Sequence, residues 1–245
     1  MFPIRDHNPS LQTPYVTWAL ILVNVGMYLL TLPVGDSYGL LWASLALYPD
    51  AVTHGAYLHG LLTHMFLHAG LMHLGGNMLF LWVFGDNLED QMGRGRFLGF
   101  YLLGGLAAAF AQILADPSSG VPMVGASGAI AGVMGGYLLL YPKARVDVLF
   151  FFLIFFKIFP IRAWIVLGVW FALQVFNGAS TVGDDGGVAY WAHAGGFLAG
   201  FALAVPTWLR LGGVRFWAQN HGHPPHPEAE YSKSHVPIVR RQPRR

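Results

Sequence analysis

Six long apolar runs, separated by more polar connections, form the main pattern along the 245-residue chain. A helix needs about 20 mostly apolar residues to cross the hydrocarbon core of a bilayer. We therefore interpret the runs as membrane-spanning helices, and the pattern predicts an all-α membrane protein. The predicted spans, numbered one to six, are Tyr15–Leu32, Leu71–Phe84, Phe97–Ala115, Val121–Tyr141, Ile161–Phe176 and Val188–Pro206.

The apolar stretch that leads into span five is too long for one upright helix. Within Val148–Phe176, the residues Lys157, Pro160 and Arg162 interrupt the apolar run. We interpret Val148–Phe159 as a segment on the membrane surface and expect Arg162 at the inner margin of span five.

The spans divide the chain into three regions. Residues 1–13 form an N-terminal segment, and residues 14–206 form a single membrane domain that holds all six helices. Residues 207–245 form a polar tail rich in His, Pro and Arg, which we expect to be disordered and solvated. The connection 33–70 between spans one and two is unusually long, and its aromatic residues suit a membrane interface.

The distribution of charge predicts the orientation in the membrane. The 14 Lys and Arg residues fall before span one, between spans two and three, between spans four and five, or after span six. The connections 33–70, 116–120 and 178–187 carry only Asp as charge. Because cytoplasmic loops carry the excess of Lys and Arg, we expect both termini in the cytoplasm.

Composition excludes several classes of protein. Hydrophobic residues make up 55% of the chain and charged residues 11%, whereas a soluble domain has about 25% charged residues. A net charge of +2 is too weak to suggest nucleic-acid binding. The absence of Cys from the sequence excludes thiolate catalysis and disulfides. No Asp or Glu lies in the middle of a span, which excludes an aspartyl intramembrane protease and disfavours a transporter with a carboxylate proton relay.

Four polar residues are expected at one shallow depth in the membrane. Because successive helices alternate in direction, the outer ends of spans two, four and six face the same side. His73 and Asn77 lie near the outer end of span two, and Ser127 near that of span four. His193 is about five residues into span six, roughly 7–8 Å at 1.5 Å per residue. Polar side chains in a span are costly and are usually functional or paired.

Small residues predict that spans four and six touch. Ser127, Ala131 and Gly135 recur at a spacing of four along span four, and a G-x-x-x-G occupies 196–200 in span six. Small residues let membrane helices pack closely. We therefore expect the Ser127 hydroxyl within hydrogen-bond reach of the His193 imidazole.

A hydroxyl and an imidazole at this depth indicate nucleophilic catalysis. A serine is a poor nucleophile until a base takes its proton, and neutral imidazole does so near pH 7. The oxyanion that develops needs donors, which His73, Asn77 and the Ser127 amide could supply. Because no acid is available at this depth, the arrangement would be a Ser–His dyad.

The same residues carry a resemblance to the rhomboid intramembrane serine proteases. The motifs are Gly125-Ala126-Ser127-Gly128, Ala192-His193-Ala194-Gly195-Gly196 and His73-Leu74-Gly75-Gly76-Asn77. The resemblance covers about 14–206 and implies a six-helix bundle with a long outer loop between helices 1 and 2. It implies that Ser127 is the nucleophile and His193 the general base. His73, Asn77 and the Ser127 amide would form the oxyanion hole, with Gly125 shaping the turn.

The implied activity is cleavage of transmembrane proteins near the outer membrane face. The implied partners are transmembrane substrates and membrane lipid; no cofactor, metal or nucleic acid is implied, and the oligomeric state stays open. The alternative is a catalytically silent relative that binds transmembrane clients. The short chain, without a recognisable targeting sequence, suggests a prokaryotic plasma membrane.

The sequence departs from the resemblance at the position one turn after the nucleophile. Some rhomboids carry an aromatic residue there that packs on the catalytic histidine, but this chain has Ala131. Another group, such as Trp191, must then orient His193. We expect Gln112, Gln174 and Asn24 to form interhelical hydrogen bonds. Trp164 and Trp170 on span five could line an entry gate, but a position facing lipid is favoured.

Two further clusters of polar residues have structural interpretations. Asp86, Glu89 and Asp90 are expected to pair with Arg94 and Arg96. The outer histidines could bind a metal, since His64 and His68 have suitable spacing, but interfacial or capping roles are favoured because no carboxylate or Cys accompanies them.

Overall fold

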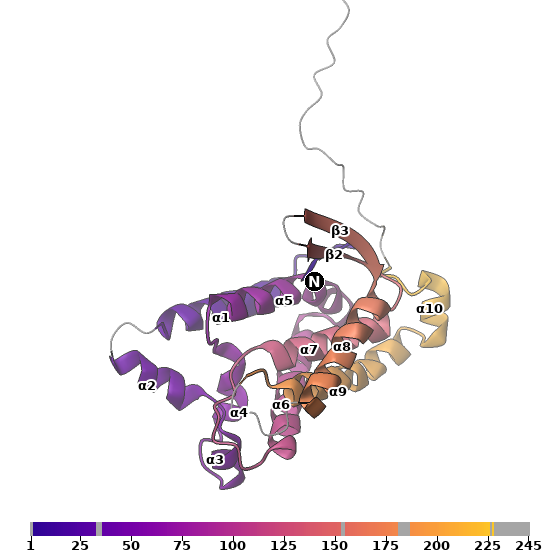
Figure 1. Ribbon diagram of the computed structural model, residues 1–245. Helices are drawn as coiled ribbons and strands as arrows, with labels where there is room; N and C mark the ends of the chain where they lie inside the picture. Colours follow the sequence, from indigo (N-terminus) through magenta and orange to yellow (C-terminus); the bar gives the residue numbers. More distant parts are fainter. Residues whose placement is uncertain (1, 33–35, 153–154, 181–186, 226, 228–245) are drawn as a thin grey trace, which may run out of the picture.

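Each apolar run of the sequence forms a long helix in the computed structural model, which describes residues 2–32, 36–152, 155–180, 187–225 and 227 (Figure 1). Backbone polar groups find no water in a bilayer core, so an apolar chain satisfies them internally as helix. The long helices are α1 (Tyr15–Leu30), α5 (Leu71–Met92), α6 (Arg94–Ala115), α7 (Ser127–Leu140), α8 (Ala163–Ser180) and α9 (Tyr190–Arg210). Shorter helices are α2 (Asp36–Leu45), α3 (Pro49–Thr53), α4 (Gly60–Thr63), the 3-10 turn η1 (His64–Phe66) and α10 (Val214–Asn220).

Among the described residues, α6, α8 and α9 are long and apolar enough to cross a membrane. The α4–η1 segment and α5 together qualify as a fourth span, bent by 92° at the break between them. Helices α1 and α7 are apolar but shorter. Helix α7 is the centre of the bundle, since all but two of its residues are buried, and α5, α6, α8 and α9 pack around it.

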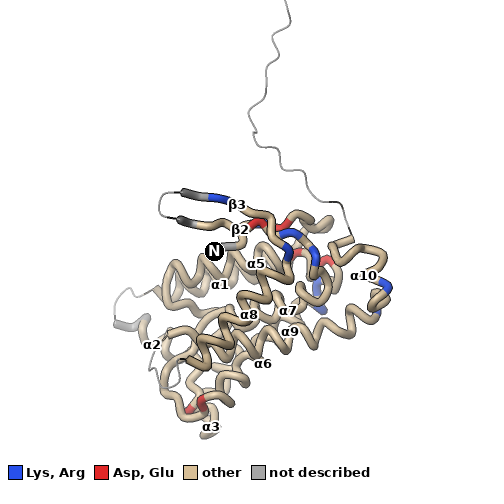
Figure 2. Tube along the Cα trace, turned by 45° about the vertical axis from the view of Figure 1, so that its right-hand side comes forward, with Lys and Arg blue, Asp and Glu red and all other residues tan. Residues whose placement is uncertain are grey.

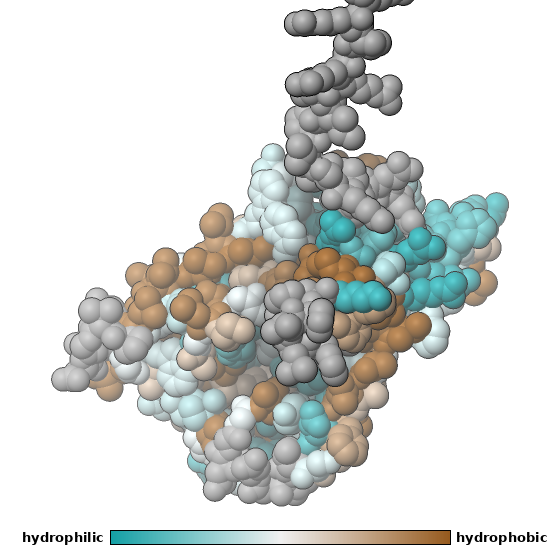
Figure 3. All heavy atoms as spheres, turned by 45° about the horizontal axis from the view of Figure 1, so that its top comes forward, coloured by the Kyte–Doolittle hydropathy of each residue, from teal (hydrophilic) through white to brown (hydrophobic). Residues whose placement is uncertain are grey.

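Hydrophobic side chains cover the lateral surface where a bilayer would lie. On α1, Leu22, Leu29 and Leu30 are all more than half exposed. The face drawn in Figure 3 is hydrophobic on the side of α1 and hydrophilic on the side of α10. Exposed leucines on a bundle whose core is already filled are expected where lipid is the solvent.

The expectation of an all-α fold is wrong at one end of the bundle. Strands β1 (Phe2–Asp6), β2 (Arg145–Phe152) and β3 (Phe155–Arg162) form an antiparallel sheet in the order β1-β2-β3. The segment interpreted as lying on the membrane surface is therefore a β-hairpin, and α8 begins only at Ala163. Aromatic and β-branched residues favour strands, and β1 supplies the third strand from far away in the sequence.

An ion-pair cluster ties the sheet together. The Arg5 Nε–H donates to Asp147 at 2.7 Å, and His7 Nε2 lies 2.7 Å from the other carboxylate oxygen. Burial raises the pKa of Asp147, but the hydrogen bonds from His7 and Arg5 outweigh it and hold the pKa below its usual value. Figure 2 shows both basic and acidic residues near the sheet, whereas the end near α3 shows acidic residues alone.

The expected ion pairs between the acidic residues of α5 and Arg94 or Arg96 do not form among the described residues. Glu89 accepts the backbone N–H groups of Val16 and Thr17 at 2.9 and 2.8 Å, and also the Thr17 hydroxyl at 2.9 Å. This buried carboxylate therefore caps the first turn of α1, where a negative charge also suits the helix dipole. Arg94 instead lies over the Tyr15 ring, 4.5 Å from its centroid.

The first part of the predicted disordered tail is helical. Helix α9 continues through Pro206 to Arg210, and α10 follows with Phe216 buried. Trp217 Nε1–H donates to the Leu139 carbonyl at 2.9 Å, which fixes α10 to the end of α7. The end of the predicted disordered tail, residues 228–245, lies outside the described residues.

Candidate active site

The predicted contact between spans four and six is confirmed, and it includes the glycines predicted for span six. A Cβ atom on Gly196 would lie 2.2 Å from the Gly128 carbonyl oxygen, and one on Gly200 would lie 2.0 Å from that of Gly132. Gly135 of the predicted α7 row also meets the α9 backbone, so Gly128 and Gly132 add a neighbouring row to the predicted one. Without side chains between them, the two backbones approach closely enough to fix the relative height of the helices.

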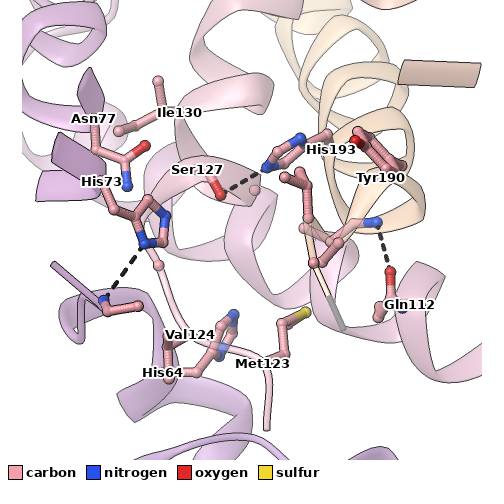
Figure 4. Close-up of a pocket in the computed structure, with 18 of the residues that line it drawn as sticks. His64, His73, Asn77, Gln112, Met123, Val124, Ser127, Ile130, Tyr190 and His193 are labelled. Carbon is pink, nitrogen blue, oxygen red and sulfur yellow. Dashed lines mark hydrogen bonds between the residues drawn. The ribbon is translucent and has the colours of Figure 1, made fainter. Parts of the chain in front are cut away.

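This close packing brings the two candidate catalytic groups together (Figure 4). Ser127 is the first residue of α7, and His193 lies in the first turn of α9. The Ser127 Oγ and the His193 Nε2 are 2.8 Å apart, a normal hydrogen-bond distance. The structure thus places a hydroxyl against an imidazole at the end of the bundle opposite the sheet.

The other side of the His193 ring is held by α8. His193 Nδ1 lies 2.9 Å from Gln174 Oε1, and the Trp170 ring packs on the imidazole with centroids 5.7 Å apart. The expectation that Trp170 faces lipid is wrong. Trp191, our named candidate for orienting the histidine, lies instead near Gly178, where a Cβ would come within 3.2 Å of its ring.

A signal for these two residues was present in the sequence. Trp170 and Gln174 are four residues apart and so share one face of span five. Gln174 also lies near the outer end of that span, at the expected depth of His193. The interhelical hydrogen bond predicted for Gln174 is therefore confirmed, and its partner is the candidate base.

Two donors from α5 face the serine across a cavity. His73 and Asn77 lie one turn apart and both line a cavity of about 680 Å³ together with Ser127 and His193. The Asn77 Nδ2 group is buried and has no hydrogen-bond partner among the described residues. Figure 4 shows the Asn77 and His73 side chains beside Ser127. A buried amide without a partner is costly, so it is available to a group that enters the cavity.

The turn before α7 fits only a glycine. Gly125 has a φ of +128°, and a Cβ atom there would lie 2.8 Å from the His73 ring and 3.5 Å from Ser127 Oγ. Its N–H donates to the His64 carbonyl at 2.9 Å. The next residues begin α7, and the first N–H groups of a helix have no partner inside it. The turn therefore leaves backbone donors beside the serine hydroxyl.

Three histidines of the run from His54 to His73 bond to nearby backbone, whereas neither ring nitrogen of His68 has a hydrogen-bond partner among the described residues. His54 Nδ1, His59 Nε2 and His64 Nδ1 lie 2.6–2.8 Å from the carbonyl oxygens of Asp50, Ser44 and Gly60 respectively. Among the described residues, no group of three or more His, Asp or Glu side chains is arranged to hold a metal ion.

The chain is similar to a known family over most of its length. The family model described as Rhomboid domain matches residues 55–210, which contain all the candidate site residues. The mitochondrial Rhomboid protein 1 of Saccharomyces cerevisiae is 32% identical over 190 residues, 76% of this chain and 51% of that protein.

Two bacterial relatives show the same similarity. Rhomboid protease GluP of Bacillus subtilis is 37% identical over 146 residues, 60% of this chain and 26% of that protein. Rhomboid protease GlpG of Salmonella typhi is 25% identical over 193 residues, 77% of this chain and 62% of that protein. The chain thus spans between about a quarter and three fifths of the length of these relatives. With the family model covering well over half of it, the chain belongs to the rhomboid family of integral membrane proteins.

Proposed function

We propose that this protein is an intramembrane serine endopeptidase that cleaves transmembrane proteins near the outer membrane face through a Ser127–His193 dyad. The observation that carries the proposal is the 2.8 Å hydrogen bond between the serine hydroxyl and the imidazole beside a cavity. The bacterial relatives GluP and GlpG, both named as proteases, support the same class of reaction.

The reaction begins when His193 Nε2 takes the Ser127 proton and Oγ attacks the carbonyl carbon of a substrate peptide bond. The oxyanion of the tetrahedral intermediate then accepts hydrogen bonds from His73, Asn77 and the Ser127 amide, while Gly125 keeps the turn open. His193 passes its proton to the leaving amine. His193 then deprotonates a water, which attacks the acyl-enzyme carbonyl. The bond from Oγ to the acyl group breaks, the product leaves with its new carboxyl group, and His193 returns the proton to Oγ.

The proposed topology has six spans with both termini in the cytoplasm. The Lys and Arg residues near the sheet support a cytoplasmic position for that end, and the site then faces the outer side. The short helices α1 and α7 would be the first and fourth spans. We propose a prokaryotic plasma membrane as the location; the yeast relative is named as mitochondrial.

Reconstitution into liposomes with a single-span model substrate tests the activity. We expect the purified wild-type protein to cut the substrate once, close to the outer end of its helix, at a bond that mass spectrometry identifies. The alternative, a silent relative that binds transmembrane clients, predicts capture of the same substrate without cleavage. Retention of both Ser127 and His193 argues against that alternative.

Asn77→Ala is expected to lower kcat by about 10- to 100-fold. Removing one oxyanion donor costs about 10²–10³-fold in a well-studied protease, and two other donors remain here. Because the amide serves the intermediate rather than the bound substrate, KM should change little. Steady-state cleavage in liposomes measures both parameters. Leu71→Ala, at an exposed position of the same helix, is the control, and equal rates for the two variants would contradict the role of Asn77.

A further inference from the structure

We infer that Gln174 is a positioning residue that fixes the tautomer and orientation of His193, so that the working unit is Ser127–His193–Gln174. The inference rests on the proposed function and adds a member to its machinery. A neutral amide in this place is unlike the carboxylate that completes the common serine-protease triad.

Hydrogen bonds determine which way the Gln174 amide points. Its Nε2 lies 3.2 Å from the Trp170 carbonyl oxygen, one turn earlier on α8. A carbonyl oxygen can only accept, so the amide nitrogen must face it. The amide oxygen then faces His193 Nδ1, 2.9 Å away. The helix backbone therefore determines the orientation of the side chain.

The orientation of the amide in turn determines the tautomer of the imidazole. Because Gln174 Oε1 can only accept, His193 Nδ1 must carry the hydrogen. In the neutral ring, the lone pair is then on Nε2, the atom 2.8 Å from the Ser127 hydroxyl. This is the tautomer that a general base needs. In the opposite tautomer, Nε2–H would donate to the Ser127 oxygen and could not take its proton, and the Nδ1 lone pair would face the Gln174 oxygen.

Trp170 restrains the same ring from a second direction. Its indole packs on the imidazole at a centroid distance of 5.7 Å and an interplanar angle of 35°. On the α7 side, Ala131 is too small to do this. Gln174 and Trp170 both belong to α8, so the histidine is oriented by that helix. Correct seating of α8 against α9 is therefore a condition for an active dyad.

Three substitutions at one position test the inference in liposomes. Gln174→Leu keeps the bulk and removes the acceptor. Gln174→Glu keeps an oxygen at the same reach, and its protonated carboxyl can also donate to the Trp170 carbonyl. Gln174→Asn keeps the amide but shortens it. We expect the Gln174→Leu and Gln174→Asn variants to have a kcat about 10- to 100-fold lower. This is the factor for one hydrogen bond to a group that becomes charged. The Glu variant should retain most of the activity.

Two further readouts separate positioning from folding. Positioning predicts an unchanged KM for a transmembrane substrate and slower labelling of Ser127 by a fluorophosphonate, a small probe that does not depend on substrate docking. Leu173→Ala, at a half-exposed neighbouring position of α8, is the matched control and should label at the wild-type rate. If the Gln174→Leu variant fails to fold, the comparison of Gln174→Glu with Gln174→Asn tests the inference.

The outcomes distinguish this inference from the proposed function. Wild-type kcat and labelling in folded Gln174→Leu or Gln174→Asn would overturn the role of Gln174 and leave the protease intact. Equal losses in the Glu, Asn and Leu variants would also overturn it, because the acceptor oxygen would then be irrelevant. A wild-type protein that neither cleaves nor labels would overturn the proposed function and this inference together.

Discussion

Ser127→Ala is expected to reduce cleavage of a transmembrane substrate by about 10⁴-fold or more, to the level of empty liposomes. In the proposed mechanism, every step passes through the bond between Oγ and the substrate carbonyl, and alanine has no atom that can form it. Among the described residues, the serine hydroxyl makes one hydrogen bond, to His193, so the variant should fold. Product formation in liposomes, followed over hours, measures the loss.

The matched control for this experiment is Ser118→Ala. Ser118 is an exposed serine in the connection between α6 and α7, and its hydroxyl bonds only to the exposed Asp116 side chain among the described residues. The Ser118→Ala variant should cleave the substrate at the wild-type rate. His193→Ala should be as inactive as Ser127→Ala, and the double variant no worse than either, because the two groups act as one unit. Continued cleavage by folded Ser127→Ala would exclude the serine mechanism.

The second large effect is expected from a single methyl group at the helix contact. Gly200→Ala would place a Cβ atom 2.0 Å from the Gly132 carbonyl oxygen and 2.3 Å from its Cα. These are backbone atoms of α7, so α7 and α9 must move apart. We expect a loss of about 3 kcal/mol or more in stability, at the upper end of overpacking effects. In a chain of this size that corresponds to a fall of about 6–12 °C in Tm.

Activity should fall together with stability in this variant, because the distance between Ser127 and His193 depends on the same contact. Gly99→Ala on α6 is the control, since a Cβ atom there meets nothing within 4 Å. It should leave Tm unchanged or raise it, as alanine favours a helix over glycine. Thermal unfolding in detergent measures both variants. An unchanged Tm for Gly200→Ala would mean that the two helices are not held at this contact.

The helices and the central hydrogen bond could be predicted because both follow from local features. Long apolar runs form helices wherever they are placed in lipid, and alternating helix direction gives the depth of each polar residue. That reasoning put Ser127 and His193 at one height without knowledge of the fold. The spacing of small residues predicted the contact through Gly135, Gly196 and Gly200, but not the part that Gly128 and Gly132 add to it.

The parts that the sequence did not predict depend on partners distant in the chain. The hairpin of β2 and β3 pairs with β1, which completes a three-stranded sheet. Glu89 caps α1 and does not pair with the nearby arginines. Gln174 was predicted to bond to another helix but not to the candidate base. The strand β2, the Glu89 carboxylate and the Gln174 amide could each bond to several groups, and the packing of the bundle selects one of them.

The pairing of β1 with β2 has a consequence for biosynthesis. Arg5 and Asp147, which join these strands, are 142 positions apart, and helices α1, α5, α6 and α7 are all translated between them. Until β2 has been translated, β1 has no strand beside it. The Asp6 carboxylate likewise has no Tyr137 hydroxyl to accept a hydrogen bond from until α7 has been translated. The sheet therefore closes only after the first four long helices have been translated.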